Sequence, residues 1–154
     1  EYTLSEKSKE MEAGKLKAVI TQNIDGLHQK AGSQKVLELH GSVYRNKCMD
    51  CGKRFELDYI IRADGIPKCE RCGGIVKPEV VLYEECLDND VIEASIKHIE
   101  KADMLIIGGT SLSVYPAAGL GSYYKGDKLV LINQSQTQYD EKADLVIYGN
   151  IAEV

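Results

Sequence analysis

The clearest indication of the fold class is the segment Met104-Leu105-Ile106-Ile107-Gly108-Gly109-Thr110-Ser111. Its first five residues form a continuous apolar run, which is typical of a strand covered on both faces, as in a parallel sheet. Three other short apolar runs, at residues 17–21, 129–133 and 144–148, have the same character. We therefore predict four buried strands of one parallel sheet.

Helical patterns alternate with these strands. A helix is predicted to open at Asp90 and to lead directly into the strand at 104–108. Its apolar face carries Ile92, Ile96 and Ile99. Pro116 suits the first turn of a short helix before the strand at 129–133, and a weaker helix is predicted for residues 2–13. The alternation predicts the α/β class, with a Rossmann-like parallel sheet and helices on both faces.

Four cysteines form two C-x-x-C pairs, separated by seventeen residues. They are Cys48, Cys51, Cys69 and Cys72. Two such pairs can supply a closed tetrahedral Zn²⁺ shell, which leaves no ligand position open for catalysis. Gly52 and Gly73-Gly74 follow the pairs and suit sharp turns. Disulfides or a thioredoxin-like dithiol are the alternatives, but disulfides need an oxidising compartment and a redox motif needs only one pair.

Composition narrows the class of protein. The chain has 154 residues, 44% of them hydrophobic and 28% charged, which is ordinary for one globular domain with a small insert. No apolar run approaches the roughly 20 residues that cross a bilayer, and no signal peptide is evident, so we expect a cytoplasmic, reducing location without membrane contact. A net charge of −5 argues against direct nucleic-acid binding. The fifth cysteine, Cys86, is expected to be an inert packed thiol.

Polar residues follow three of the predicted strands. These segments are residues 21–28, 108–112 and 133–137. Ligands of α/β sheets bind at the carboxyl ends of strands, so the three segments are expected to meet along one rim. The Gly-Gly-Thr-Ser turn at 108–111 suits a phosphate or a ribose, although alone it is a weak nucleotide signal.

Several motifs together resemble one family. In order along the chain they are Thr21-Gln22-Asn23-Ile24-Asp25-Gly26-Leu27-His28, Glu38-Leu39-His40-Gly41-Ser42, the four cysteines, Lys77-Pro78-Glu79-Val80-Val81, Gly109-Thr110-Ser111-Leu112, Tyr115-Pro116-Ala117-Ala118 and Leu131-Ile132-Asn133. This order is similar to that of the sirtuins, the NAD-dependent protein lysine deacylases. The resemblance covers about residues 14–154.

The resemblance implies a reaction in which an acyl-lysine oxygen attacks C1′ of the nicotinamide ribose of NAD. Nicotinamide leaves, and the acyl group ends on ADP-ribose. His40 then matches the general base that acts on the ribose hydroxyls, a task that suits an imidazole. Asn23 matches the second catalytic residue, which holds ribose and a water. Val80 and Val81 match the segment that pairs with an acylated protein or peptide substrate as an added strand.

The resemblance also assigns cofactor contacts and zinc ligands. The residues that match NAD contacts are Gln22, Asn23, Ile24, Asp25, Gly109, Thr110, Ser111 and Asn133. The four cysteines match the ligands of one structural zinc ion per chain. Simpler roles stay open: Asp25 can cap a turn, and Thr110 and Ser111 can cap the next helix. The implied domains are a partial Rossmann-like NAD-binding domain at 1–47 and 83–154, and a zinc-binding module at 48–82.

The chain departs from the family pattern in two places. A first strand with a Gly-Ala-Gly-x-Ser loop and a Pro-Asp-Phe-Arg segment are absent, so we expect the N-terminal part of the catalytic domain to be missing. Because that loop would bind the pyrophosphate, the chain alone is expected to bind NAD weakly and turn over little. Tyr83-Glu84-Glu85 stands where the family has Phe-Gly-Glu.

Three functions follow as hypotheses. The first is an NAD-dependent lysine deacylase. The second is a non-catalytic remnant that binds NAD or protein, and the third is an NAD hydrolase or ADP-ribosyl transferase that uses the same pocket. Nicotinamide release that requires an acetyl-lysine peptide distinguishes the first from the third.

Overall fold

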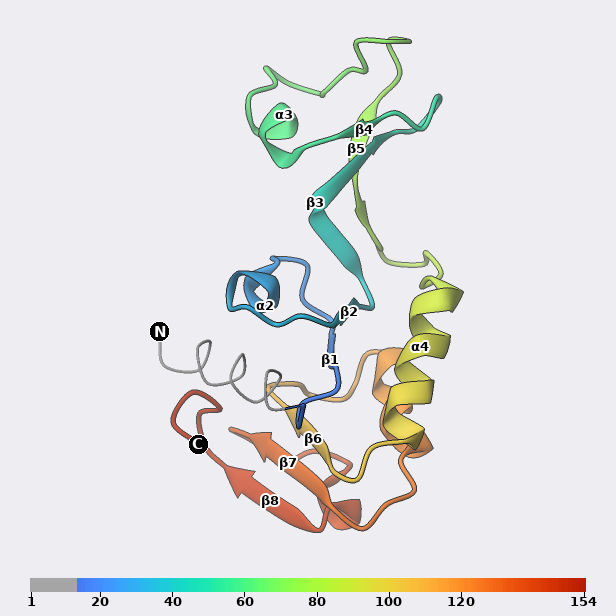
Figure 1. Cartoon of the computed structure of the whole chain (residues 1–154). Coiled ribbons are helices and arrows are strands. Elements are labelled where there is room, and N and C mark those ends of the chain that lie inside the picture. Colours follow the sequence, from blue (N-terminus) through green and yellow to red (C-terminus); the bar gives the residue numbers. More distant parts are fainter. Residues whose placement is uncertain (1–13) are drawn as a thin grey trace.

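The computed structural model describes residues 14–154, so the helix predicted for residues 2–13 lies outside the described residues. The described chain forms two lobes, which Figure 1 shows one above the other. The lower lobe contains parallel strands with helices, and the upper lobe contains a small antiparallel sheet.

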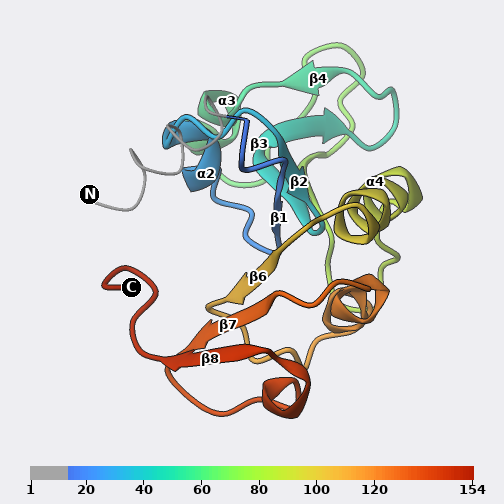
Figure 2. The same ribbon diagram turned by 60° about the horizontal axis from the view of Figure 1, so that its bottom comes forward.

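All four predicted strands are present, but the expectation that all are covered on both faces is wrong, because Ile106, Leu145 and Tyr148 are exposed. The strands are β1 (Val19–Thr21), β6 (Leu105–Gly108), β7 (Leu129–Asn133) and β8 (Leu145–Tyr148). A fifth parallel strand, β2 (Val36–Glu38), pairs with β1 and was not predicted. In the described residues these strands form two pieces of parallel sheet, β1-β2 and β6-β7-β8. Figure 2 shows β6, β7 and β8 side by side.

The register of the parallel strands brings their carboxyl ends to one edge. Gly108 at the end of β6 pairs with Ile132 near the end of β7, and Asn133 pairs with Tyr148 at the end of β8. The residues after β6 and β7 therefore leave the sheet at the same rim. This is the arrangement that the polar segments in the sequence predicted.

Helix α4 (Asn89–Glu100) confirms the predicted helix before β6. Asp88 caps it, because its Oδ1 accepts hydrogen bonds from the N–H groups of Asp90 and Val91. The short helix expected after Pro116 is present, but it is the 3₁₀ helix η1 (Ala117–Tyr123) rather than an α-helix. Two glycines lie within it, and glycine disfavours a regular α-helix.

Two apolar clusters hold the parallel lobe together. One buries Leu39, Ile99, Ala117 and Leu120, so it joins the residue after β2 to α4 and η1. The other buries Leu112, Leu131 and Tyr139 beneath β7. Ile20 of β1 and Leu105 of β6 both pack against the first cluster. The two pieces of sheet therefore share one core.

The antiparallel lobe is built on one long strand. β3 (Gly41–Cys48) pairs with β4 (Arg54–Phe55) on one side and β5 (Val76–Val80) on the other. Helix α3 (Leu57–Ile61) covers this sheet. β3 begins next to His40 and ends at a cysteine of the quartet, so it connects the two lobes (Figure 1). The sheet thus begins at Gly41, before the module boundary expected at 48, and that boundary stays a prediction.

No helix among residues 14–154 has the length and apolar character to cross a bilayer.

The expectation that Cys86 is packed is wrong, because its side chain is exposed. It lies in the irregular segment between β5 and α4, where Glu84 has a positive φ of 70° and neighbouring residues are also exposed.

Candidate active site and metal centre

The four cysteines of the two C-x-x-C pairs converge at one point. Their Sγ atoms all lie within 4.8 Å of one another. The Sγ atoms of Cys48 and Cys72 are 3.4 Å apart, and those of Cys51 and Cys69 are 3.6 Å apart. A tetrahedral ion with Zn–S bonds of about 2.3 Å requires edges of about 3.8 Å between sulfurs. The donor set and its spacing therefore fit a structural zinc ion, and neither alternative, disulfide or lone redox pair, fits four convergent free thiols.

Each pair lies on the same kind of turn. The N–H of Gly52 donates to the carbonyl of Cys48 at 3.0 Å, and the N–H of Gly73 donates to the carbonyl of Cys69 at 2.8 Å. Both glycines have positive φ, 69° and 77°, which side-chain-bearing residues rarely adopt. The sharp turns expected at these glycines are confirmed, and they present both thiols of a pair on one side.

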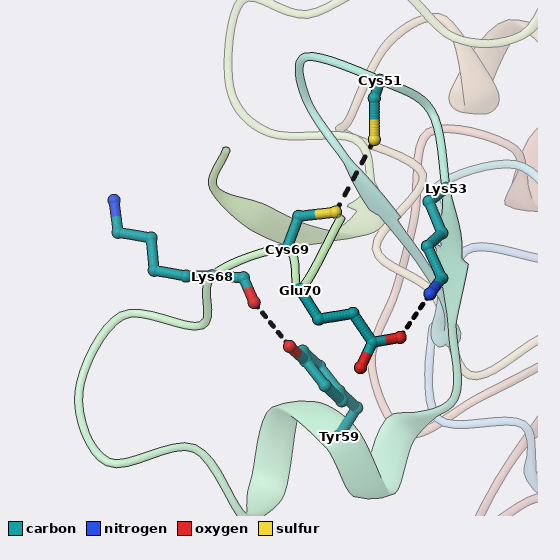
Figure 3. A network of polar contacts seen from close by, with 6 residues as sticks. All are labelled: Cys51, Lys53, Tyr59, Lys68, Cys69 and Glu70. Carbon is teal, nitrogen blue, oxygen red and sulfur yellow. Dashed lines mark hydrogen bonds and ion pairs between the residues drawn. The ribbon is translucent and has the colours of Figure 1, made fainter. Parts of the chain in front are cut away.

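Two basic side chains lie next to the cysteine pairs. Arg71 donates to the carbonyl of Cys51 at 2.6 Å, and Lys53 forms an ion pair with Glu70 between the two turns (Figure 3). The backbone N–H of Lys53 lowers the pKa of Cys51 to about 6, with further hydrogen bonds from neighbouring thiols and Arg71. At Cys72 the backbone N–H of Gly74 lowers the pKa, but hydrogen bonds with Cys51 and Cys48 outweigh it and raise the pKa to about 12. Cys51 is therefore a thiolate at neutral pH, and zinc binding requires the other thiols to lose their protons as well.

His40 lies immediately before β3, at the junction of the two lobes. Its Nδ1 is 3.1 Å from the backbone carbonyl oxygen of Gln22. A carbonyl only accepts hydrogen bonds, so in the neutral imidazole this contact places the proton on Nδ1 and the lone pair on Nε2. The imidazole is therefore directed to the segment that contains Asn23, and its second nitrogen can accept a proton.

The segment after β1 carries the other residues expected to contact the nicotinamide ribose. Asn23 is exposed, and its backbone N–H is held by Thr21 Oγ1 at 3.1 Å. Asp25 is also exposed, and its Oδ1 accepts a hydrogen bond from the N–H of Leu27 at 3.0 Å. Asp25 thus does cap a turn, as the simpler interpretation proposed. A carboxylate has two oxygens, so Oδ2 remains able to accept from an amide.

The turn after β6 is joined to the ends of β1 and β7 through Thr110. The amide side chain of Asn133, buried at the end of β7, accepts from the N–H of Thr110 at 3.0 Å and donates to its carbonyl at 2.6 Å. Gln22 donates to the hydroxyl of Thr110 at 3.4 Å. The hydroxyl also accepts from the N–H of Leu112, so Thr110 stabilises its own turn and does not cap η1. The three predicted rim segments do meet.

Beside this turn lies an open hollow of about 560 Å³. It is lined by Ser111, Leu112, Ser113, Tyr115, Gln136, Thr137 and Gln138. Of the expected cofactor residues only Ser111 lines it. Leu112 has a positive φ of 53°, and Gln138 donates to its carbonyl at 2.6 Å, which fixes this strained turn. Sequence reasoning missed Gln138, because an amide 26 positions away from its partner gives no local signal.

The expected substrate segment lies directly beside His40. Val80 pairs with Gly41, the residue after the histidine, and the N–H of Val81 donates to the carbonyl of His40 at 3.0 Å. In the described residues β5 is an edge strand of its sheet. An edge strand offers free backbone groups to an added strand.

A second hollow, of about 540 Å³, lies on the antiparallel lobe between α3 and the loop before Cys69. It is lined by Asp58, Tyr59, Arg62, Ala63, Asp64, Ile66, Pro67 and Lys68. None of the residues that the sequence singled out lines it. The hollow is therefore separate from the candidate active site.

Comparison with known proteins supports the family resemblance that the motifs indicated. The model of the Sir2 family matches residues 6–116. An NAD-dependent protein deacetylase of Clostridium acetobutylicum is 65% identical over 144 residues, which are 93% of this chain and 59% of that protein. A protein of the same name from Clostridium perfringens is 64% identical over 144 residues, again 59% of its length. The chain therefore spans about three fifths of these curated relatives.

Solved structures show the same fold. A Sir2 structure in complex with an inhibitor, 2′-O-acetyl-ADP-ribose and a deacetylated p53 peptide has a TM-score of 0.90 and 38% identity, and the match covers 98% of this chain and 67% of that one. A structure described as Sir2 with p53 peptide and NAD⁺ has a TM-score of 0.89 and 37% identity, with 97% and 65% covered. Both structures are described with a p53 peptide, and the second also with NAD⁺.

Proposed function

This chain belongs to the Sir2 family, and from that premise we propose that it carries the catalytic histidine, part of the NAD site and the zinc site of an NAD-dependent protein lysine deacylase. The observation that carries the proposal is the contact between His40 Nδ1 and the carbonyl of Gln22. It joins the candidate base to the loop that carries Asn23 and Asp25. The relatives named for deacetylation, and the neighbour described with a p53 peptide and NAD⁺, support the same chemistry.

In this proposal NAD supplies the ribose carbon that accepts the acyl oxygen, with nicotinamide as the leaving group. His40 takes a proton at Nε2, because Nδ1 is committed to the carbonyl of Gln22. The side chain of Asn23 orients the ribose. Asp25 accepts from the nicotinamide amide at Oδ2 while Oδ1 holds the turn. Gly109, Thr110 and Ser111 face the remainder of the cofactor, and Asn133 holds the backbone of Thr110.

The substrate in this proposal is an acylated lysine in a protein or peptide. The edge of β5 binds the peptide backbone on either side of the modified lysine, at Val80 and Val81. Because Val81 is hydrogen-bonded to His40, a strand added here places its lysine beside the base. Backbone pairing makes few demands on sequence, so this contact accommodates many peptides.

The four cysteines hold one zinc ion in the proposal, with a structural role. All four ligand positions are thiols, so no position is open for a substrate. The free thiols of the cluster also favour a reducing, cytoplasmic location, because an oxidising compartment promotes disulfides.

The test uses two proteins: this chain, and this chain joined to the part of the Clostridium acetobutylicum relative that the match does not cover. Each is mixed with NAD and an acetyl-lysine peptide, and nicotinamide release and peptide mass are followed. We expect the joined protein to release nicotinamide only when the peptide is present. Replacing His40 by Ala should lower kcat by about 100-fold or more. Release without peptide would favour an NAD hydrolase or transferase instead.

The isolated chain is the second protein in this test. We expect weak NAD binding and little turnover from it, measured by isothermal titration. Micromolar affinity for NAD in the chain alone would contradict that expectation. NAD binding by the joined protein without any nicotinamide release would favour the non-catalytic hypothesis.

A further inference from the structure

One aromatic ring of the antiparallel lobe lies against the loop that carries Asn23 and Asp25. Tyr44, midway along β3, has its ring next to Gly26. A Cβ placed on Gly26 would be 2.7 Å from Cε2 and 3.0 Å from Cδ2 of this ring, so only a glycine leaves room for it. Gly26 is buried although its neighbours Asp25 and Leu27 are exposed. The ring of Tyr44 therefore covers the backbone of this loop.

Other contacts fix the ring and the loop together. The N–H of Val43 donates to the carbonyl of Ile24 at 3.1 Å, which ties β3 to the loop one residue before Asp25. Lys30, at the end of α2 (Leu27–Lys30), has its ammonium 5.3 Å from the centre of the Tyr44 ring. The ring is thus held between the turn at Gly26 and the following helix.

The conformation of Gly26 explains why the loop needs such support. Its φ is 66°, and it precedes a helix of only four residues that has no side-chain hydrogen bond at its N-cap. A helix of only four residues contributes little stability of its own. The direction of Asp25 and Asn23 therefore depends on packing from outside as well as on the local hydrogen bonds at these two residues.

We propose that Tyr44 is a positioning residue: its ring holds the 23–26 loop in place from β3, the strand that ends at Cys48. Tyr44 does not contact the reacting atoms, and it acts through the backbone of Gly26. Because β3 ends in the cysteine cluster, the ring is also a contact through which the metal-binding lobe supports the cofactor loop, beside the hydrogen bond from Val43 to Ile24. The inference about catalysis rests on the proposed function, whereas the inference about loop order does not.

The experiment combines loop dynamics with kinetics. Tyr44→Ala in the zinc-loaded chain should raise amide hydrogen exchange within residues 23–30 by about tenfold, with β6–β8 unchanged. Tyr123→Ala is the matched control, because Tyr123 has a similar exposure, 42% against 39% for Tyr44, and lies in η1 far along the chain. Tyr44→Phe keeps the ring and should behave like the unmodified chain.

In the joined protein, Tyr44→Ala should lower kcat by about 10- to 100-fold while the KM for the acetylated peptide stays within about twofold. Gly26→Ala should cause a similar loss, because its Cβ would meet the ring. In the double variant the second substitution should add less than it does alone, as expected for two residues in contact.

Two results would overturn the inference. Exchange in residues 23–30 that is unchanged by Tyr44→Ala would show that the ring does not hold the loop. A Tyr44→Phe variant as impaired as Tyr44→Ala would show that the hydroxyl, not the ring, matters. Failure of the proposed function is seen separately, as an unmodified joined protein without deacylation, and it leaves the exchange measurement in force.

Discussion

The two lobes of this chain bury different kinds of groups. In the parallel lobe the two clusters bury seven residues, and all are aliphatic or aromatic. In the antiparallel lobe the cluster buries four, and two of them are the thiols Cys48 and Cys69. Phe55 and Val76 are the only other members at that depth. The parallel lobe is thus stabilised by apolar burial. In the small lobe, half of the buried cluster consists of thiols of the candidate metal site.

This difference explains how the active site is supported. The candidate cofactor residues extend from strand ends of the parallel lobe, where Thr110 and Asn133 hold one another. The candidate base and the substrate segment instead lie where β3 and β5 leave that lobe. The proposed catalysis therefore depends on both lobes. A substitution that destabilises one lobe can be recognised because the other lobe keeps its structure.

Loss of the metal site is the change with the largest expected effect. Cys69→Ala removes a ligand that is 2% exposed, and the antiparallel lobe then loses a contribution that reaches about 10–16 kcal/mol in small zinc-binding peptides. We expect zinc content to fall to near zero and residues 42–80 to lose protection from hydrogen exchange. The strands β6–β8 should keep theirs, because apolar packing holds them.

Cys86→Ala is the matched control, since this thiol is exposed and outside the cluster. It should leave zinc content and exchange unchanged. If Cys69→Ala kept a full equivalent of zinc, or if exchange rose equally in both lobes, the two-lobe difference would not hold.

Removing core volume from the parallel lobe is the next largest change. Leu131 is 1% exposed at the centre of β7, and Leu131→Ala should lower the free energy of unfolding by about 3–5 kcal/mol. Urea denaturation followed by circular dichroism measures this change. Zinc content should stay at one equivalent, which is the reverse of the result for Cys69→Ala.

Ile61→Ala serves as the control for Leu131→Ala, because Ile61 is 69% exposed on α3 and should change the free energy by at most about 0.5 kcal/mol. Zinc lost from the Leu131 variant would mean that the two lobes unfold as one unit.

The parallel lobe was predictable from sequence because its signal is local. Four continuous apolar runs indicated β1, β6, β7 and β8, and capping by Asp88 lies within two residues of the predicted start of α4. β2 was missed because its apolar run is only Val36-Leu37, between a lysine and a glutamate, whereas the equally short β1 lies in a longer run. β3 was missed because five of its eight positions are exposed or polar, and it is fixed by pairing with β5 some thirty residues later.

The candidate site likewise has one part that the sequence predicts and another that it does not. Cysteine spacing predicted a metal cluster because each pair makes its own turn, and the structure brings the pairs together. The contact between His40 and the carbonyl of Gln22 crosses 18 positions and uses a backbone atom, so no side-chain pattern reports it. The contact of the Tyr44 ring with Gly26 also could not be predicted from the sequence. A buried glycine with positive φ only marks where such a contact is possible.

A substitution at the junction should affect both lobes moderately. Gly41 has a φ of 76°, and a Cβ there would lie 1.9 Å from the carbonyl oxygen of Glu79. Gly41→Ala should therefore cost about 2–4 kcal/mol, from strain and from a backbone shift in the β3–β5 pair. Because His40 is the preceding residue, activity of the joined protein should fall more steeply than stability.

Gly65→Ala is the control for this position, because Gly65 also has positive φ, 82°, but has nothing within 4 Å of its Cβ position. It should cost about 1 kcal/mol from strain alone. Equal effects of the two substitutions would show that the junction is not closely packed.

The smallest expected effect concerns the ion pair that joins β3 and β5 in the metal-binding lobe. Lys47 Nζ lies 2.9 Å from Glu79, with side chains 48% and 24% exposed, so Glu79→Gln should cost only about 0.2–1 kcal/mol. The hydrogen bond from Lys47 holds the pKa of Glu79 below its usual range. The contribution is therefore present at neutral pH and is lost as the pH falls through that lowered pKa.

Urea denaturation of the zinc-loaded chain at pH 7, in low salt and in 1 M salt, measures the ion pair's share. The cost of Glu79→Gln should shrink in high salt, because salt screens exposed charges. Glu93→Gln breaks the more exposed pair with Lys97 on α4 and should cost about 0.3 kcal/mol. A cost above about 2 kcal/mol for Glu79→Gln exceeds what a partly exposed pair provides. It would mean that charge pairing, and not the metal, holds β3 against β5.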